Sequence, residues 1–233
     1  MKKEKIETIL LKIEELNPNL KTELYYETPF QLLIAVLLSA QSTDVQVNKA
    51  TKTNWFFKKV KSPQDVIDLW HNQIKSYINS IGLSNSKTKN IFNLSCKILE
   101  LKKPSNNKEK KILERYWYII PSNLQGLTAL PWVGVKTAKV VLSVLYEIPC
   151  VPVDTHIHRV SNRLWIVETK TELQTSNNLE KIIPQKLKNK AHHLLIFFGR
   201  YFCKAKKPEC QSCPFNSGCF YFHNNEKDEK TDR

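Results

Sequence analysis

Glycine is scarce in this chain of 233 residues. Glycine reaches left-handed backbone conformations without the steric cost that a side chain imposes. In a chain with so few glycines, each one therefore marks a candidate backbone position that other residues fit poorly. The five glycines are Gly82, Gly126, Gly134, Gly199 and Gly218.

Arginine is equally scarce, since lysine supplies all but five of the 36 basic residues. The formal net charge of +14 favours a polyanionic partner, because basic side chains neutralise phosphates and release counterions. A composition rich in Lys, Asn and Ile also produces positive charge without any nucleic-acid partner. Charge alone therefore leaves open a simply basic, solvated surface.

Long apolar runs are absent from the sequence. The longest, Phe30–Ala40, contains Gln31 and falls short of the roughly 20 residues that span a bilayer. The charged N-terminus, Met1–Thr8, lacks the apolar core of a secretory signal. We expect a cytoplasmic protein in which Phe30–Ala40 forms a buried helix.

Alternating apolar and polar stretches of strand length are also scarce, and the apolar spacing is helical nearly throughout. Thr28-Pro29 and Ser62-Pro63 are typical helix starts, each with an N-cap hydroxyl followed by proline. Asp65 stands where a capping box needs it. The sequence predicts an all-α fold.

Six cysteines are unevenly distributed. Cys96 and Cys150 stand alone in apolar surroundings, which indicates packing. The other four crowd into residues 203–219 with the spacing C-x6-C-x2-C-x5-C, which favours a metal site over disulfides in a protein without an export signal. Spacing alone leaves zinc and an iron–sulfur cluster open.

A helical hairpin is predicted from Leu124–Leu130 and Lys136–Tyr146, which are joined by a short segment containing Gly134. The amides at the start of the second helix point outward and suit a phosphate. An ordinary helical hairpin fits the same spacing, and this simpler interpretation stays open.

Four segments together resemble the endonuclease III family of DNA glycosylases. The hairpin segment 130–138 (LPWVGVKTA) resembles that family's helix–hairpin–helix, and the segment 151–160 (VPVDTHIHRV) resembles its catalytic aspartate segment. Segments 37–44 (LLSAQSTD) and 81–83 (IGL) are similar to its two loops that probe the DNA strands. The four clustered cysteines follow its cluster spacing.

The resemblance implies two helical domains with a DNA-binding cleft between them. The first is a six-helix domain at 23–149 that contains the helix–hairpin–helix. The second combines 1–22 with 150–222 and carries a [4Fe–4S] cluster, and 223–233 forms a polar tail. The implied partner is double-stranded DNA with a damaged base or an abasic site, bound by a monomer. The implied cluster ligands are Cys203, Cys210, Cys213 and Cys219.

The resemblance also implies the chemistry of a bifunctional glycosylase and AP lyase for oxidised pyrimidines. Lys136 attacks the sugar C1′, expels the base and forms a Schiff base, after which β-elimination breaks the strand on the 3′ side. Asp154 stabilises positive charge at C1′ and assists proton transfers. Because Asp-Thr before an apolar stretch is also a good helix start, Asp154 is equally a predicted N-cap.

The implied DNA contacts lie on the two probing loops, the hairpin and the cysteine segment. Gln41 fills the space that a flipped base leaves, and Leu83 wedges into the opposite strand. The lysines of the cysteine segment contact phosphates. The predicted contact residues are Gln41, Leu83, Trp132, Val133, Gly134, Val135, Lys204, Lys206 and Lys207.

Two departures from the family pattern weaken the expected hairpin contact. Trp132 stands where the family usually has glycine, and Val135 replaces a commonly basic residue. If position 132 requires a positive φ, tryptophan costs about 1 kcal/mol or more there.

Other functions remain open. An adenine-mismatch glycosylase shares the aspartate and the cluster, although it lacks a lysine at position 136. Trp132 motivates a non-catalytic or weakened DNA-binding protein with the same hairpin. A metal-dependent nuclease has little support, and we assign no chemistry to His156, His158, His192 or His193.

Overall fold

The computed structural model describes residues 3–18 and 22–224. Residues 225–233, which make up most of the predicted polar tail, lie outside the described residues. Every regular element among the described residues is helical, which confirms the predicted all-α class. None of these helices combines the length and the apolar character that crossing a membrane requires.

The chain divides into two compact units, Glu23–Glu147 and a second unit formed by Met1–Thr22 with Ile148–Arg233. The first unit holds helices α2 to α9 and the π-helical segment η1. Their bounds are α2 Pro29–Leu38, α3 Asp44–Asn48, η1 Lys49–Thr53, α4 Phe56–Lys59, α5 Pro63–Ile78, α6 Ser84–Leu99, α7 Asn107–Tyr116, α8 Leu124–Thr128 and α9 Val135–Tyr146.

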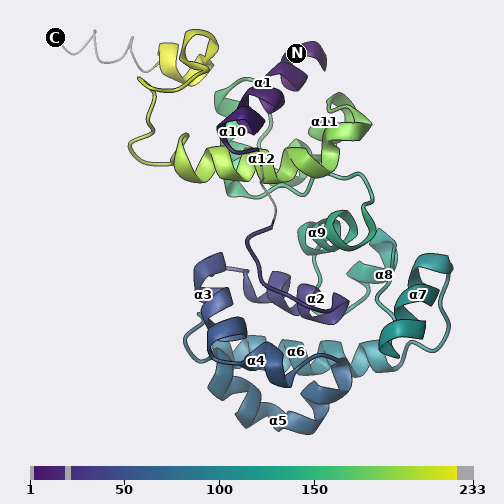
Figure 1. Ribbon diagram of the computed structural model, residues 1–233. Coiled ribbons are helices and arrows are strands. Elements are labelled where there is room, and N and C mark those ends of the chain that lie inside the picture. Colours follow the sequence, from purple (N-terminus) through teal and green to yellow (C-terminus); the bar gives the residue numbers. More distant parts are fainter. Residues whose placement is uncertain (1–2, 19–21, 225–233) are drawn as a thin grey trace. The chain divides into compact units, whose positions relative to one another are not determined.

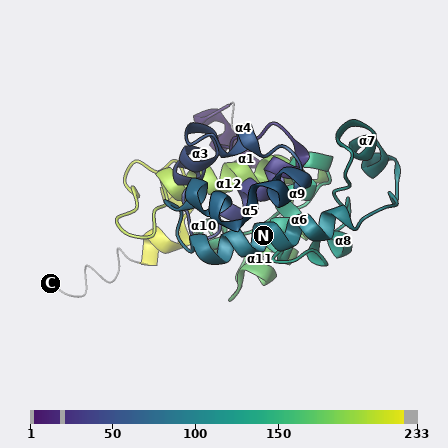
Figure 2. The ribbon, with the colours of Figure 1, turned by 90° about the horizontal axis from the view of Figure 1, so that it is seen from below.

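Helix α2 is the centre of the first unit, and all but one of its ten residues are buried. It packs against α9 and α6, while α5 and α6 lie side by side (Figures 1 and 2). Val36 and Leu32 of α2 meet Val140 of α9 in one apolar cluster. The prediction that Phe30–Ala40 forms a buried helix is therefore confirmed, with the helix ending at Leu38.

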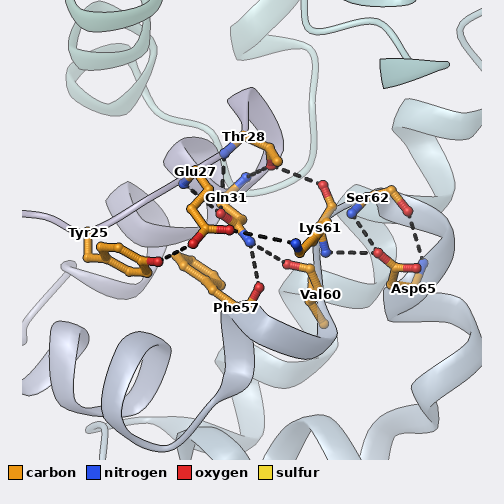
Figure 3. A network of polar contacts seen from close by, with 9 residues as sticks. All are labelled: Tyr25, Glu27, Thr28, Gln31, Phe57, Val60, Lys61, Ser62 and Asp65. Atoms are coloured by element: carbon orange, nitrogen blue, oxygen red, sulfur yellow. Dashed lines mark hydrogen bonds and ion pairs between the residues drawn. The ribbon is translucent and has the colours of Figure 1, made fainter. Parts of the chain in front are cut away.

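The start of α2 is fixed by a buried polar network (Figure 3). The Thr28 hydroxyl accepts from the Gln31 amide, and the Gln31 side chain accepts from the Thr28 amide at 3.2 Å. The fully buried Gln31 also donates to the carbonyls of Phe57 at 2.7 Å and Val60 at 2.8 Å, so it joins α2 to the end of α4.

The start of α5 repeats this arrangement with Ser62 and Asp65 (Figure 3). Both predicted N-caps and the Asp65 capping box are thus confirmed. A helix terminus leaves four amides without an intrahelical partner, and these caps satisfy part of that demand at the two helix starts.

The second unit is built from the two ends of the sequence. Its core is formed mainly by apolar residues of α1, α10 and α12, such as Leu10, Ile157 and Phe198. Helix α12 packs against both α1 and α10 (Figure 1). The bounds are α1 Lys3–Leu16, α10 Thr155–Arg163, α11 Glu172–Ile182, η2 Gln185–Leu187, α12 Lys188–Tyr201 and η3 Asn216–Gly218.

The expectation for the glycines holds at two positions and is wrong at the other three. A Cβ at Gly199 would lie 3.0 Å from the His156 Cβ, so its absence lets α12 approach α10 closely. A Cβ at Gly126 would lie 2.7 Å from the Pro121 Cβ. Gly82, Gly134 and Gly218 have room for a side chain, and no glycine in the chain has a positive φ.

Candidate functional site

The predicted hairpin is formed by α8 and α9, and the connection between them turns through Trp132. Trp132 has φ 65° and exposes 64% of its surface, so most of the residue faces solvent. Val133 is buried and donates its amide to the Leu130 carbonyl at 3.3 Å. The turn is therefore anchored on its inner side and open on its outer side.

Helix α9 begins immediately after Gly134, which is its N-cap and has no side chain to cover the first amides. Lys136 is an exposed residue of the first turn, next to the half-exposed Val135. A helix N-terminus attracts anions through its amides and its dipole. This helix start thus has no side-chain cap, and the amine of Lys136 belongs to the same turn.

Two further loops of the same unit present the residues that resemble strand-probing groups. Gln41 follows α2, is exposed, and has φ 56°. Leu83 is the N-cap of α6, has φ 61°, and exposes 61% of its surface. A Cβ on Gly82 would lie 3.8 Å from the Gln41 carbonyl oxygen, so the two loops are neighbours.

Lys87 connects these two loops. It lies one turn into α6 and is 7% exposed, yet it carries an amine. The amine donates to the carbonyls of Leu38 at 2.9 Å and Ala40 at 2.7 Å, and to the Ser42 hydroxyl at 3.0 Å. Burial lowers the pKa of the Lys87 ammonium. The three donors of the ammonium match three acceptors around the Gln41 loop, residues 39–43.

In the other unit, Asp154 is the N-cap of α10. Its side chain accepts from the Ile157 amide at 2.9 Å, so the predicted capping role is confirmed. Two hydrogen bonds hold the segment before Asp154: Ser176 donates to the Val151 carbonyl at 2.7 Å, and the buried His192 ring meets the Pro152 carbonyl at 2.7 Å. Hydrogen bonds on both sides of Asp154 therefore position its carboxylate.

The histidines near this segment make contacts within the protein. The His158 ring lies 2.7 Å from the Thr175 hydroxyl, and the His156 ring lies 3.2 Å from the Arg159 guanidinium. These contacts tie His158 to α11 and His156 to Arg159 within α10.

The cysteine loop, residues 203–219, contains one 3-10 turn and is fastened to α10 by two arginines. Arg159 donates to the Cys203 carbonyl at 3.0 Å and to the Gly199 carbonyl at 2.7 Å. Arg163 donates to the Lys204 carbonyl at 2.7 Å and approaches the Cys203 sulfur at 3.7 Å. These hydrogen bonds hold the start of the cysteine loop against α10.

The four cysteines of the loop are free and influence one another. Burial raises the pKa of the Cys210 thiol, and the neighbouring thiols of Cys203 and Cys219 raise it further. Burial likewise raises the pKa of Cys213, with a contribution from the other three thiols. Mutual repulsion of this kind is what a shared metal centre relieves.

The four thiols and the nearby guanidinium of Arg163 are groups of the kind that a thiolate-bound cluster uses. Their side chains are not drawn together into a coordination sphere, since no group of three or more His, Cys, Asp or Glu in the described part of the chain is arranged to hold a metal ion.

The lysines of the cysteine loop differ from one another. Lys204 pairs with Glu209 at 2.6 Å, whereas Lys206 and Lys207 are exposed. Lys207 has φ 50°, which marks a tight turn in the loop. Lys206 and Lys207 are therefore the more exposed cations of the cysteine loop.

Sequence reasoning missed Lys87, Arg159 and Arg163. The arginines carried a usable signal, because two of only five arginines stand four positions apart and share a helix face. Lys87 carried none, since one lysine among 31 looks like surface charge.

Comparison with known proteins agrees with this geometry. Residues 34–185 match the family described as HhH-GPD superfamily base excision DNA repair protein. The all-helical fold, the hairpin and this match together define a helix–hairpin–helix protein of base excision repair.

Endonuclease III of Rickettsia conorii is 45% identical over 208 residues, which cover 89% of this chain and 91% of the relative. Endonuclease III of Escherichia coli K12 is 42% identical over 95% of this chain and 97% of its own length.

Solved structures give the same result. A trapped covalent intermediate of endonuclease III with DNA matches with a TM-score of 0.83 and 37% identity, covering 97% of this chain and 99% of the solved chain. A non-covalent endonuclease III–DNA complex matches equally well. This chain belongs to the endonuclease III family, as its sequence motifs predicted.

Proposed function

We propose that this protein is a bifunctional DNA glycosylase and AP lyase of base excision repair, which excises oxidised pyrimidines and then cleaves 3′ to the abasic site. The observation that carries the proposal is Lys136, an exposed amine in the first turn of the hairpin's second helix. A phosphate held at that terminus brings the sugar of the same nucleotide within reach of the amine.

The two steps place different demands on Lys136 and Asp154. The neutral amine of Lys136 attacks C1′, the C1′–N bond to the base breaks, and the Schiff base forms as the sugar ring opens. Loss of a proton from C2′ then expels the 3′ phosphate by β-elimination. Asp154 stabilises positive charge at C1′ while the base departs and assists the proton transfers.

Base flipping precedes this chemistry, because C1′ is shielded while the base is stacked. Gln41 occupies the vacated space and Leu83 enters the opposite strand. Their exposure on neighbouring loops supports this assignment. The hairpin, residues 132–135, and the exposed Lys206 and Lys207 supply phosphate contacts.

Cys203, Cys210, Cys213 and Cys219 would hold a [4Fe–4S] cluster. The cluster would organise the cysteine loop and so present Lys206 and Lys207 to the DNA. The free thiols and the guanidinium of Arg163 beside the Cys203 sulfur support this role.

Borohydride trapping tests the function. We expect the protein to form a covalent adduct with an abasic-site duplex and to cleave a thymine glycol duplex. Lys136→Ala should abolish the adduct, while Lys111→Ala, which removes an exposed lysine of the same unit, should not. A folded protein that binds the duplex but never traps would be a non-catalytic hairpin protein. Excision confined to adenine mismatches would indicate the other glycosylase class.

A further inference from the structure

The tryptophans of this chain occupy left-handed backbone positions, which favour glycine. All five lie in the described residues, and every one has a positive φ. L-residues avoid this region because Cβ clashes with the backbone, and a bulky residue there is an outlier. The five glycines show the reverse, since none has a positive φ. The φ values are 66° at Trp55, 57° at Trp70, 64° at Trp117, 65° at Trp132 and 51° at Trp165.

Two of these positions are helix C-terminal motifs that normally take glycine. Trp165 follows α10, where its amide donates to the Asn162 carbonyl and the Ile166 amide donates to the Ser161 carbonyl at 2.8 Å. This pair of bonds is a Schellman motif with Trp165 at its left-handed residue. Trp117 ends α7 in the simpler left-handed motif, with its amide donating to the Leu113 carbonyl at 2.9 Å.

Trp70 is the most extreme case. It interrupts α5 with φ 57° and ψ 158°, a combination that is essentially confined to glycine. A tryptophan at this point has neither the backbone freedom of glycine nor a helical conformation to favour it.

The indole rings add no compensating burial. Their exposed fractions range from 54% at Trp165 to 86% at Trp117, although tryptophan is on average a well-buried residue. Lys58 lies 4.0 Å from the Trp55 ring, and Phe220 lies 4.5 Å from the Trp165 ring. These contacts involve the side chains of Trp55 and Trp165. They do not explain why the backbone has a positive φ at these residues.

We propose that these five positions are glycine positions, and that the cell inserts glycine at each because the codon there is UGA. UGA specifies tryptophan in some genetic codes and glycine in others, so one codon assignment changes all such residues together. This one codon assignment then accounts for two observations. Every tryptophan has a positive φ and is exposed, and glycine is scarce.

The proposal also restores the hairpin. With glycine at position 132 the segment 130–134 becomes Leu-Pro-Gly-Val-Gly, and the backbone can approach a phosphate without the indole. Since this consequence rests on the proposed function, the decisive tests are independent of activity.

The gene and the natural protein give those tests. We expect UGA at all five codons, and glycine in the five corresponding peptides of the protein isolated from its source cells by mass spectrometry. A UGG codon at any of the five, or an indole in any of these peptides, would overturn the proposal.

Recombinant protein tests the structural premise. A variant with all five Trp→Gly substitutions should unfold roughly 10 °C or more above the chain with tryptophan, because each glycine relieves left-handed strain. Leu173→Gly, an exposed apolar residue in the regular helix α11, is the matched control and should lower the melting temperature. An equal or lower melting temperature for the five-fold variant would contradict the premise.

A second inference rests on a different observation, the buried amine of Lys87. Its three hydrogen bonds all end on residues 38–42, although Lys87 itself belongs to the helix that Leu83 begins. Leu38 is the last residue of α2, so the ammonium also faces the negative end of that helix.

We infer that Lys87 is a positioning residue for base flipping. It fixes the position of the Gln41 loop relative to Leu83. The inference rests on the proposed function. It requires the two loops to act together on the duplex, and it gives Lys87 no part in the chemistry at C1′.

We expect substitution of Lys87 to slow the reaction on duplex DNA and to leave the reaction on single-stranded DNA nearly unchanged. Lys87→Met should lower kcat for excising thymine glycol from a duplex by about tenfold or more, because two probing loops lose their common anchor. Cleavage of an abasic site in single-stranded DNA should stay within about twofold, since no opposite strand is probed. Lys89→Met, an exposed lysine of the same helix, should change neither rate.

Ser42→Ala removes one of the three acceptors and provides a milder variant should Lys87→Met fold poorly. It should lower duplex excision by about twofold to fivefold with single-strand cleavage intact. Equal losses on both substrates, or no loss on the duplex, would overturn the positioning role. A wild-type protein inactive on both substrates would instead refute the proposed function.

Discussion

The two compact units hold their candidate DNA-contacting loops by different means. In the unit Glu23–Glu147, capped helices and buried polar side chains such as Gln31 and Lys87 fix the loops with protein atoms alone. In the other unit, the cysteine loop has only a short 3-10 turn, and two arginines of α10 hold one end of it. Under the proposed function, the cysteine loop also depends on the cluster that its thiolates would bind, whereas the first set of loops needs no bound group.

The largest expected effect is at Asp154, where the carboxylate serves both as a cap and in the proposed chemistry. Asp154→Asn keeps a good N-cap and removes the charge. We expect base excision to fall by about 10²- to 10⁴-fold with a nearly unchanged melting temperature. Single-turnover kinetics and thermal unfolding measure the two. Full activity in the variant would reduce Asp154 to a helix cap.

Removing a thiol should destabilise the unit that carries the cysteine loop and leave the other unit unchanged. We expect Cys213→Ala to lose iron and to destabilise the unit that carries the cysteine loop by several kcal/mol, because binding energy of a metal site is folding energy. Hydrogen exchange should then rise around the cysteine loop and stay low in α2 and α6. Cys96→Ala, which alters a cysteine of the other unit, is the control. Unchanged iron content in Cys213→Ala would argue against the ligand assignment.

A smaller effect is expected at Glu109, which is buried and accepts hydrogen bonds from the amides and hydroxyls of Ser105 and Ser122. Burial alone would raise the pKa of Glu109, but these hydrogen bonds outweigh it and the pKa is lowered. Glu109→Gln should cost about 1 to 3 kcal/mol of unfolding free energy at pH 7.

The sign of the pH dependence follows from the lowered pKa. The stabilisation by Glu109 is fully present above the pKa of the unfolded chain and is lost as the pH falls through the lower folded value. The difference between the wild type and Glu109→Gln should therefore shrink on acidification in urea titrations. Glu100→Gln, an exposed carboxylate paired with Lys97, should show little difference at any pH. A gap that widens in acid would contradict the assignment.

The smallest effect is expected for the exposed lysines of the cysteine loop. The double variant Lys206→Ala and Lys207→Ala should weaken binding to all duplexes alike and lower the slope of log K against log salt by about 2. Lys204→Ala should change the slope less, because Lys204 is paired with Glu209. A sequence-dependent loss would show that these lysines do more than contact phosphates.

Local chemistry made much of the fold predictable. Proline after a hydroxyl residue marks the starts of α2 and α5, and apolar spacing marks the length of α9, because these signals act within a few residues. The family motifs likewise located Lys136 and Asp154 on the first turn of one helix and at the cap of another.

Long-range contacts were not predictable in the same way. Lys87 meets Ala40 across 47 positions and Arg159 meets Cys203 across 44, and no local pattern announces such a pair. The sequence raised a positive φ at Trp132 only as a condition. The value itself follows from the conformation of the whole turn.

The most direct test of the central claim is to locate the covalent bond. Borohydride reduction on an abasic-site duplex, followed by proteolysis and mass spectrometry, should place the sugar on the ε-amine of Lys136, in the first turn of α9. A sugar on another lysine or on the N-terminal amine would contradict this assignment of the nucleophile.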